Sequence, residues 1–248
     1  MSDADGWEAL AAFTPARVAL GRTGNALPTR RVLEFQLAHA RARDAVHARF
    51  DAQGLAAALV PLPCVCLESQ ATGRAEYLAQ PDLGRRLSAA SRARLAPGAY
   101  DAALVIADGL SATAIAAHGA ALAKAILERL PQLAWAPVAV VSNGRVAVGD
   151  DVAEALGAEL VVVMIGERPG LSAADSVGLY LTWRPRAGVT TDAMRNCISN
   201  VRTGGLGLGD AAHRLAWLVT QARRLRVSGV NLKEDAPQSL TDGGTAGC

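Results

Sequence analysis

The feature that most constrains the fold is an alternation of short apolar runs and helical periods in the second half of the chain. The segment DAALVIA (101–107) is a continuous apolar run, which is typical of a strand buried on both faces. Further strands are predicted over residues 136–142, 158–166 and 176–183, and a final helix over residues 210–225. Strands and helices that follow one another in this way pair in parallel through right-handed crossovers. The pattern predicts an α/β fold with a Rossmann-like, mostly parallel sheet flanked by helices.

Each predicted helix carries an apolar face at helical spacing. The helix after DGLS is expected to bury Ile115, Gly119, Leu122, Ile126 and Leu130. The final helix is expected to bury Ala211, Leu215, Leu218, Ala222 and Leu225. Between them, Asp151 is placed to cap the short helix VAEALG. The spacing therefore predicts which faces of these helices pack against the sheet.

The first half of the chain has a less regular pattern, which predicts a division into parts. Residues 1–28 contain glycines and a proline and are expected to form an extended docking arm. Residues 29–97 are expected to form a smaller, mainly helical N-terminal domain, with Thr29 as a helix cap, a strand around Val65 and a helix over 82–95. The α/β domain then spans residues 98–233. The tail 234–248 is low in apolar content and is expected to be disordered.

Composition excludes several classes of protein. With 25 basic and 23 acidic residues the net charge is only +2, so a nucleic-acid partner is not expected. No apolar run approaches the roughly 18 residues of a membrane-spanning helix, and the acidic N-terminus does not resemble a secretory signal. Four cysteines without a CxxC pair indicate a reduced, cytoplasmic protein.

Three glycine-containing corners lie where predicted strands end: Asp108–Gly109, 143–145 and 166–170. In an open α/β sheet, ligands bind outside the carboxyl ends of the strands, where such loops meet. These corners therefore predict a binding edge. Structural alternatives are left open at this point, because Asp108 could cap the next helix and Glu167 could be a surface partner of an arginine. The four histidines are expected on helix surfaces, and Cys197 could be a small apolar filler.

No complete catalytic motif is present in the sequence. GGLGLG (204–209) follows no predicted strand and does not have the spacing of a dinucleotide loop. The chain also lacks a P-loop lysine, a nucleophile elbow and an HExxH metal motif. The residues by themselves indicate a binding scaffold.

The motifs RVALGRTGNALPTRRVLEFQLAHARARDAVH, IGERPGLSAADSVGLYLTW and RNCISNVRTGGL resemble the small (light) subunit family of ethanolamine ammonia-lyase. The resemblance runs from about residue 16 to residue 233. It implies an adenosylcobalamin-dependent carbon–nitrogen lyase, a radical enzyme that converts ethanolamine to acetaldehyde and ammonia. It also implies that the catalytic residues lie on the large subunit, so the isolated chain is expected to be inactive.

The resemblance implies three cofactor-binding residues: Val146 in GRVAVGD, Glu167 in GERPG and Cys197 in RNCISN. Val146 would offer an apolar contact or a main-chain group. Glu167 would accept hydrogen bonds from a ribose hydroxyl or a corrin amide, and Cys197 would pack near the nucleotide tail. No metal ligand is expected, because the D-x-H-x-x-G signature of a cobalt-binding histidine is absent.

The resemblance further implies a large-subunit partner, in a dodecamer of six large and six small chains. Segments containing Arg17, Arg22 and Arg43 are expected to dock on it. The implied location is the cytoplasm, and whether this copy acts inside a bacterial microcompartment is left open. Two alternatives are also kept: a stand-alone nucleotide-binding α/β oxidoreductase and a non-catalytic structural adaptor.

Overall fold

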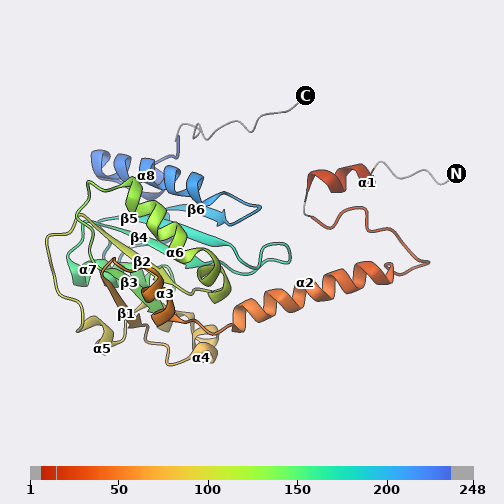
Figure 1. Cartoon of the computed structure of the whole chain (residues 1–248), viewed down its shortest axis with the longest axis horizontal. Helices are drawn as coiled ribbons and strands as arrows, with labels where there is room; N and C mark the ends of the chain where they lie inside the picture. The colour runs from red at the N-terminus through yellow and green to blue at the C-terminus, as the bar shows by residue number, and fades with distance from the viewer. Residues whose placement is uncertain (1–6, 15, 236–248) are drawn as a thin grey trace.

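The computed structural model describes residues 7–14 and 16–235 and contains a six-stranded sheet in the order β1-β3-β2-β4-β5-β6 (Figure 1). The strands are β1 (Cys64–Glu68), β2 (Ala102–Ala107), β3 (Val138–Ser142), β4 (Leu160–Gly166), β5 (Val177–Trp183) and β6 (Arg195–Val201). The first four strands pair in parallel, whereas β5 and β6 are antiparallel. The predicted α/β fold with a mostly parallel sheet is confirmed.

The antiparallel end of the sheet follows from its connections. No helix lies between β4 and β5, and only the short η3 (Asp192–Met194) lies between β5 and β6. A parallel pair needs a long crossover, so strands joined by loops of this length pair in an antiparallel manner. Strand β6 was not predicted, because its sequence RNCISNV is largely polar and exposes side chains at the sheet edge.

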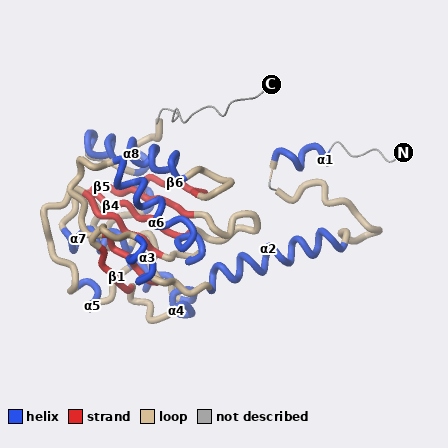
Figure 2. Tube along the Cα trace, viewed as in Figure 1, coloured by secondary structure: helices blue, strands red, loops and turns tan. Residues whose placement is uncertain are grey.

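Helices cover both faces of the sheet (Figure 2). Alternate residues of a strand point to opposite faces, so Leu104 and Ile106 of β2 pack with α6 (Ala112–Arg129) and α8 (Leu208–Leu225). Ala103 and Val105 instead pack with α7 (Val148–Leu156) on the other face. Every residue of β2 and β4 is buried, as the continuous apolar runs predicted. The predicted apolar faces of the two long helices are also buried, except for Leu225, which is half exposed.

The remaining helices are short, apart from α2 (Thr29–His47), which projects from the body of the molecule (Figure 1). Only Ala45 of α2 is buried. The others are α1 (Trp7–Leu10), η1 (Ala11–Phe13), α3 (Ala52–Ala58), α4 (Arg74–Ala79), η2 (Pro81–Arg85), α5 (Ala89–Arg92) and η4 (Gly229–Asn231). Within the described residues, no helix is long and apolar enough to cross a membrane.

Three local predictions were wrong. Thr29 is the first helical residue of α2 and not its cap, because Pro28 precedes the helix and no side chain caps it. Asp151 lies inside the first turn of α7, where its buried carboxylate accepts a hydrogen bond from Leu87 N and pairs with Arg92. The helix predicted over 82–95 is interrupted where Leu87 bridges to Ser69, so only η2 and α5 form.

The predicted division into parts stays a prediction. Strand β1 lies in the segment assigned to the N-terminal domain, yet it pairs with β3 at the edge of the same sheet. Most of the tail predicted to be disordered, residues 236–248, lies outside the described residues, as do residues 1–6 of the predicted arm.

Candidate functional site

The three glycine-containing corners lie together in the structure. Strands β3, β2 and β4 are neighbours and run parallel, so their carboxyl ends meet at one edge of the sheet. The main-chain N–H of Leu110 donates to Gly166 O at 2.9 Å, and that of Gly144 donates to Asp108 Oδ1 at 3.2 Å. These bonds join the corner after β2 to both of its neighbours.

Glycine is required where the corners touch. Gly109 has a φ of +56°, and a Cβ atom there would collide with Gly166 O. A Cβ atom on Gly166 would in turn collide with the main chain at Ser111 and Asp108. The close packing of these two loops therefore depends on the absence of side chains.

Asp108 is the buried acid of this edge. Its Oδ2 atom pairs with Arg74 Nη1 at 3.2 Å, and the same nitrogen donates to Gly109 O at 2.7 Å. Burial raises the pKa of Asp108 to about 6, although Arg74 and the main-chain N–H of Gly144 act in the opposite direction. Asp108 does not cap the next helix, because the side chain of Ser111 accepts from Ala114 N and fills that role.

Tyr77 forms a platform between two arginines. The guanidinium of Arg145 lies 4.3 Å from the centre of the Tyr77 ring, and that of Arg74 lies 4.9 Å from it. The Tyr77 hydroxyl donates to Gly144 O at 3.2 Å, and Arg145 Nη2 donates to Tyr77 O at 3.3 Å. Burial raises the pKa of Tyr77, so its hydroxyl stays protonated. Arg145 is thereby fixed at the corner after β3.

A cavity of about 420 Å³ opens at this edge. It is lined by Tyr77, Gly109, Leu110, Arg145, Val146, Ile165, Gly166, Glu167, Arg168 and Tyr180. Each of the three predicted corners contributes to the lining. We refer to this space as the corner cavity.

Glu167 lies at the wall of the corner cavity with one oxygen already bonded. Its Oε2 atom accepts a hydrogen bond from Asn200 N at 3.1 Å, and its main-chain N–H donates to Ser176 O at 3.0 Å. Each carboxylate oxygen has two lone pairs, so the group can accept hydrogen bonds beyond this one. The carboxylate is thus held in place and still offers an acceptor.

Cys197 joins the site through Tyr180. The two residues are opposite each other in the β5–β6 pair, and the Tyr180 hydroxyl donates to the Cys197 thiol. Cys197 is exposed at the sheet edge, but partial desolvation beside Tyr180 raises the pKa of its thiol and the nearby charge of Glu167 raises it further, against the hydrogen bond from Tyr180, so the thiol stays neutral. Val146 and Glu167 therefore line the corner cavity together with Tyr180, and Cys197 contacts Tyr180 from β6 without lining that cavity. The three residues come from separate parts of the sequence.

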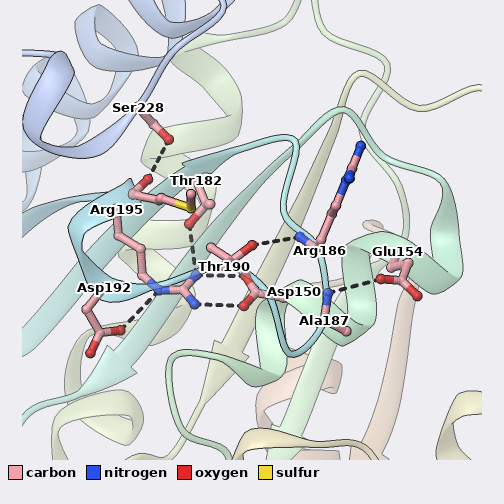
Figure 3. A network of polar contacts seen from close by, with 10 residues as sticks. Asp150, Glu154, Thr182, Arg186, Ala187, Thr190, Asp192, Arg195 and Ser228 are labelled. Atoms are coloured by element: carbon pink, nitrogen blue, oxygen red, sulfur yellow. Dashed lines mark hydrogen bonds and ion pairs between the residues drawn. The ribbon is translucent and has the colours of Figure 1, made fainter.

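A buried ion pair between Arg195 and Asp150 lies next to the corner cavity (Figure 3). Both guanidinium Nη atoms of Arg195 donate to the Asp150 carboxylate at 2.7 Å, and Nη1 also donates to Thr182 Oγ1 at 3.0 Å. Both side chains of the pair are 2% exposed. The pair connects α7 to β6, and its Arg195 lines a second cavity of about 560 Å³ that adjoins the corner cavity.

The loop after Gly166 is held from the opposite side by α6. Ser111 Oγ donates to Ala174 O at 2.8 Å, and His118 Nε2 lies 3.3 Å from Asp175 Oδ2. His118 is buried, so the prediction of a surface position was wrong for this histidine. His39 and His47 are exposed on α2, as predicted.

Sequence reasoning located the three corners, Arg145 among them, but missed the two tyrosines. Tyr180 lies within an apolar run and was indistinguishable from a core residue. One signal was available, since the chain has only three tyrosines and two of them line the corner cavity. In the described part of the chain, no group of three or more acidic, histidine or cysteine side chains is placed to hold a metal ion.

Fold and site together define an α/β protein that presents a polar cavity at the carboxyl edge of its parallel strands. A model of the family described as "Ethanolamine ammonia-lyase light chain (EutC)" matches residues 4–233. The ethanolamine ammonia-lyase small subunit of Ralstonia nicotianae is 52% identical over 248 residues, which cover 96% of this chain and 92% of that protein. The ethanolamine ammonia-lyase small subunit of Xanthomonas campestris is 52% identical over 256 residues, which cover 98% of this chain and 92% of that protein. The chain belongs to the ethanolamine ammonia-lyase small-subunit family.

Proposed function

We propose that the chain binds the nucleotide-loop side of adenosylcobalamin and docks on a large subunit, and that the pair forms an ethanolamine ammonia-lyase. The observation that carries this proposal is the convergence of Val146, Glu167 and Cys197 around Tyr180. These residues are the cofactor contacts that the family resemblance implies. They lie far apart in the sequence, yet they meet at the sheet edge where α/β proteins bind ligands.

The chemistry of these residues suits the cofactor. The Oε1 atom of Glu167 can accept a hydrogen bond from a ribose hydroxyl or a corrin amide, and a charged acceptor strengthens that bond. Val146 offers an apolar surface and a main-chain N–H, and the neutral thiol of Cys197 packs without adding charge. When bound, adenosylcobalamin would supply the radical that starts the conversion of ethanolamine to acetaldehyde and ammonia.

The size of the site supports a second subunit. The corner cavity holds about 420 Å³, which is the size of a pocket for a small ligand and too small for a whole cobalamin. This edge would therefore grip one part of the cofactor, and the large subunit would enclose the rest. In this proposal the catalytic groups and the ethanolamine site belong to the large subunit, so the isolated chain has no activity.

The projecting helix α2 supports the docking. Leu33 and Leu37 are 58% and 52% exposed and lie one turn apart on one face. Arg74 ties this helix to the site, because its Nε atom donates to Val46 O at 2.6 Å while its Nη1 atom contacts Asp108 and Gly109. A large subunit that covers α2 would therefore also lie close to the cofactor edge. The predicted docking residues Arg17, Arg22 and Arg43 are exposed.

The test is reconstitution. The chain is co-expressed with a large subunit, purified, and supplied with adenosylcobalamin and ethanolamine while acetaldehyde is measured. Turnover is expected only when both chains are present. Acetaldehyde production by this chain alone, or a complex that stays inactive with cofactor, would contradict the proposal.

Glu167→Ala provides the test at residue level. The change removes a charge-assisted hydrogen bond, so the concentration of adenosylcobalamin that gives half-maximal activity should rise about tenfold. Glu128→Ala is the matched control, because Glu128 is an exposed acid on α6. Equal effects of the two changes would exclude a specific role for Glu167.

A further inference from the structure

The second cavity, of about 560 Å³, is not explained by the three cofactor contacts above. It shares Arg145, Val146 and Tyr180 with the corner cavity, so the two spaces are adjacent parts of one depression. We refer to it as the arginine cavity. Its other lining residues come from η2, from the start of α7 and from the segment 190–195.

The lining of the arginine cavity is positively charged. Three arginines line it, Arg85, Arg145 and Arg195, against one carboxylate, Asp192. The Arg195 guanidinium is already bonded to Asp150 and Thr182, and Asp192 lies near its Nε atom while its own side chain is 93% exposed. Arg85 and Arg145 are therefore the cations available to a ligand.

Arg145 has a donor without an acceptor. Its Nε atom is buried and has no hydrogen-bond partner among the described residues. A buried N–H group without a partner costs free energy, so Arg145 has hydrogen-bonding capacity that this chain by itself does not use. Arg85 makes an exposed ion pair with Asp82 at 3.5 Å. Such a pair contributes little to stability, so Arg85 can leave Asp82 and bind a ligand instead.

The start of α7 adds main-chain donors to the same wall. Val146 and Ala147 precede the first residue of this helix, and within the described residues neither main-chain N–H donates a hydrogen bond. A helix N-terminus carries a partial positive charge and favours anions. The carboxylates of Asp150 and Asp151 in this helix are paired with Arg195 and Arg92, so they do not occupy the cavity.

We infer that the arginine cavity binds the phosphodiester anion of the cofactor's nucleotide tail, with Arg85 and Arg145 as its cationic ligands. This inference rests on the proposed function, since the corner cavity next to it would hold the adjacent part of the same molecule. A phosphodiester carries one negative charge and oxygens that can accept from guanidinium groups, which fits the donors that converge here.

The test compares two corrinoids that differ in the nucleotide tail. The complex of this chain with the large subunit is titrated with hydroxocobalamin, which carries the phosphodiester, and with cobinamide, which lacks it. Binding is measured by equilibrium dialysis. Wild-type complex should bind hydroxocobalamin more tightly. Arg145→Gln should weaken its binding about tenfold, and Arg85→Gln about threefold because that side chain is exposed. Binding of cobinamide should change less than twofold.

Controls separate a local effect from a general one. Arg224→Gln removes an exposed arginine of α8 that does not line either cavity, and it should leave both affinities unchanged. Arg145 also stacks on Tyr77, so its substitution could loosen the corner cavity, whereas Arg85 has no such contact. Equal losses for both corrinoids in Arg85→Gln would overturn the inference.

Two further outcomes distinguish the inference from the proposed function. If wild-type complex prefers hydroxocobalamin and both arginine variants keep that preference, the phosphodiester site is wrong and cofactor binding through the nucleotide loop stands. If it binds neither, the proposed function fails and the inference fails with it.

Competition with inorganic phosphate is a further test of the arginine cavity. Phosphate should compete with the binding of hydroxocobalamin and not with that of cobinamide. Phosphate that binds without affecting hydroxocobalamin would show that the cavity holds a free anion, which also overturns the inference.

Discussion

At the residue scale, Asp108 links the stability of the site to pH. Burial raises its pKa to about 6, whereas an aspartate in an unfolded chain titrates near 3.9. Between these values the folded chain binds more protons than the unfolded chain, so the free energy of unfolding falls as the pH rises from about 4 to 6. The total contribution is about 3 kcal/mol, and it is constant above that window. Asp108→Asn should remove this part of the pH dependence.

The measurement is urea unfolding of the wild-type chain and the Asp108→Asn variant between pH 4 and pH 7. The difference in unfolding free energy between them should fall with rising pH and level off above pH 6. Asp82→Asn is a suitable control, because that carboxylate is 91% exposed and should not change the curve. A difference that does not vary with pH would show that Asp108 titrates normally in the folded chain.

At the element scale, the loop 167–176 owes its position to helix α6. Ser111 and His118 hold Ala174 and Asp175, while the other end of the loop carries Glu167 into the corner cavity. His118→Ala removes one of these attachments, so amide hydrogen exchange in the loop should speed up about fivefold, because one hydrogen bond contributes about 1 kcal/mol. Exchange in the core of β4 should not change.

Asp175→Ala should have the same effect, and the double variant should add little, because both changes break one interaction. His47→Ala removes an exposed histidine and is the matched control. Additive effects of His118→Ala and Asp175→Ala would indicate that the two side chains act separately. In that case the loop would be positioned by Ser111 and by its main-chain bonds alone.

The strands and the site residues differ in how well the sequence predicts them. Continuous apolar runs predicted β2, β3 and β4, because a strand buried on both faces has no polar alternation. The corners of the site followed from these strands. The polar edge strand β6 has no continuous apolar run and was therefore not predicted. Arg74 and Arg145, which both contact the Tyr77 ring, are 71 residues apart in the sequence. Their contact depends on tertiary packing, which no local period encodes.

At the scale of the whole molecule, α2 is a long helix with almost no intramolecular packing. Eighteen of its nineteen residues are not buried, and its apolar Leu33 and Leu37 lie on one exposed face. Exposed apolar side chains arranged on one face of a projecting element are typical of a protein interface. The contacts of Arg74 with Val46 and Asp108 place the base of this helix beside the cofactor edge.

Replacing Leu33 and Leu37 together by aspartate should weaken association with the large subunit at least tenfold, because two charges would be buried without partners. The yield of large subunit that co-purifies with a tagged chain measures this effect. The variant should unfold at the wild-type temperature, since neither leucine supports the core. Leu225→Asp replaces an equally exposed leucine at the end of α8 and should leave co-purification unchanged. If both variants co-purify like the wild type, α2 does not form the interface. The large subunit would then contact the sheet edge directly, through the loops that surround the two cavities.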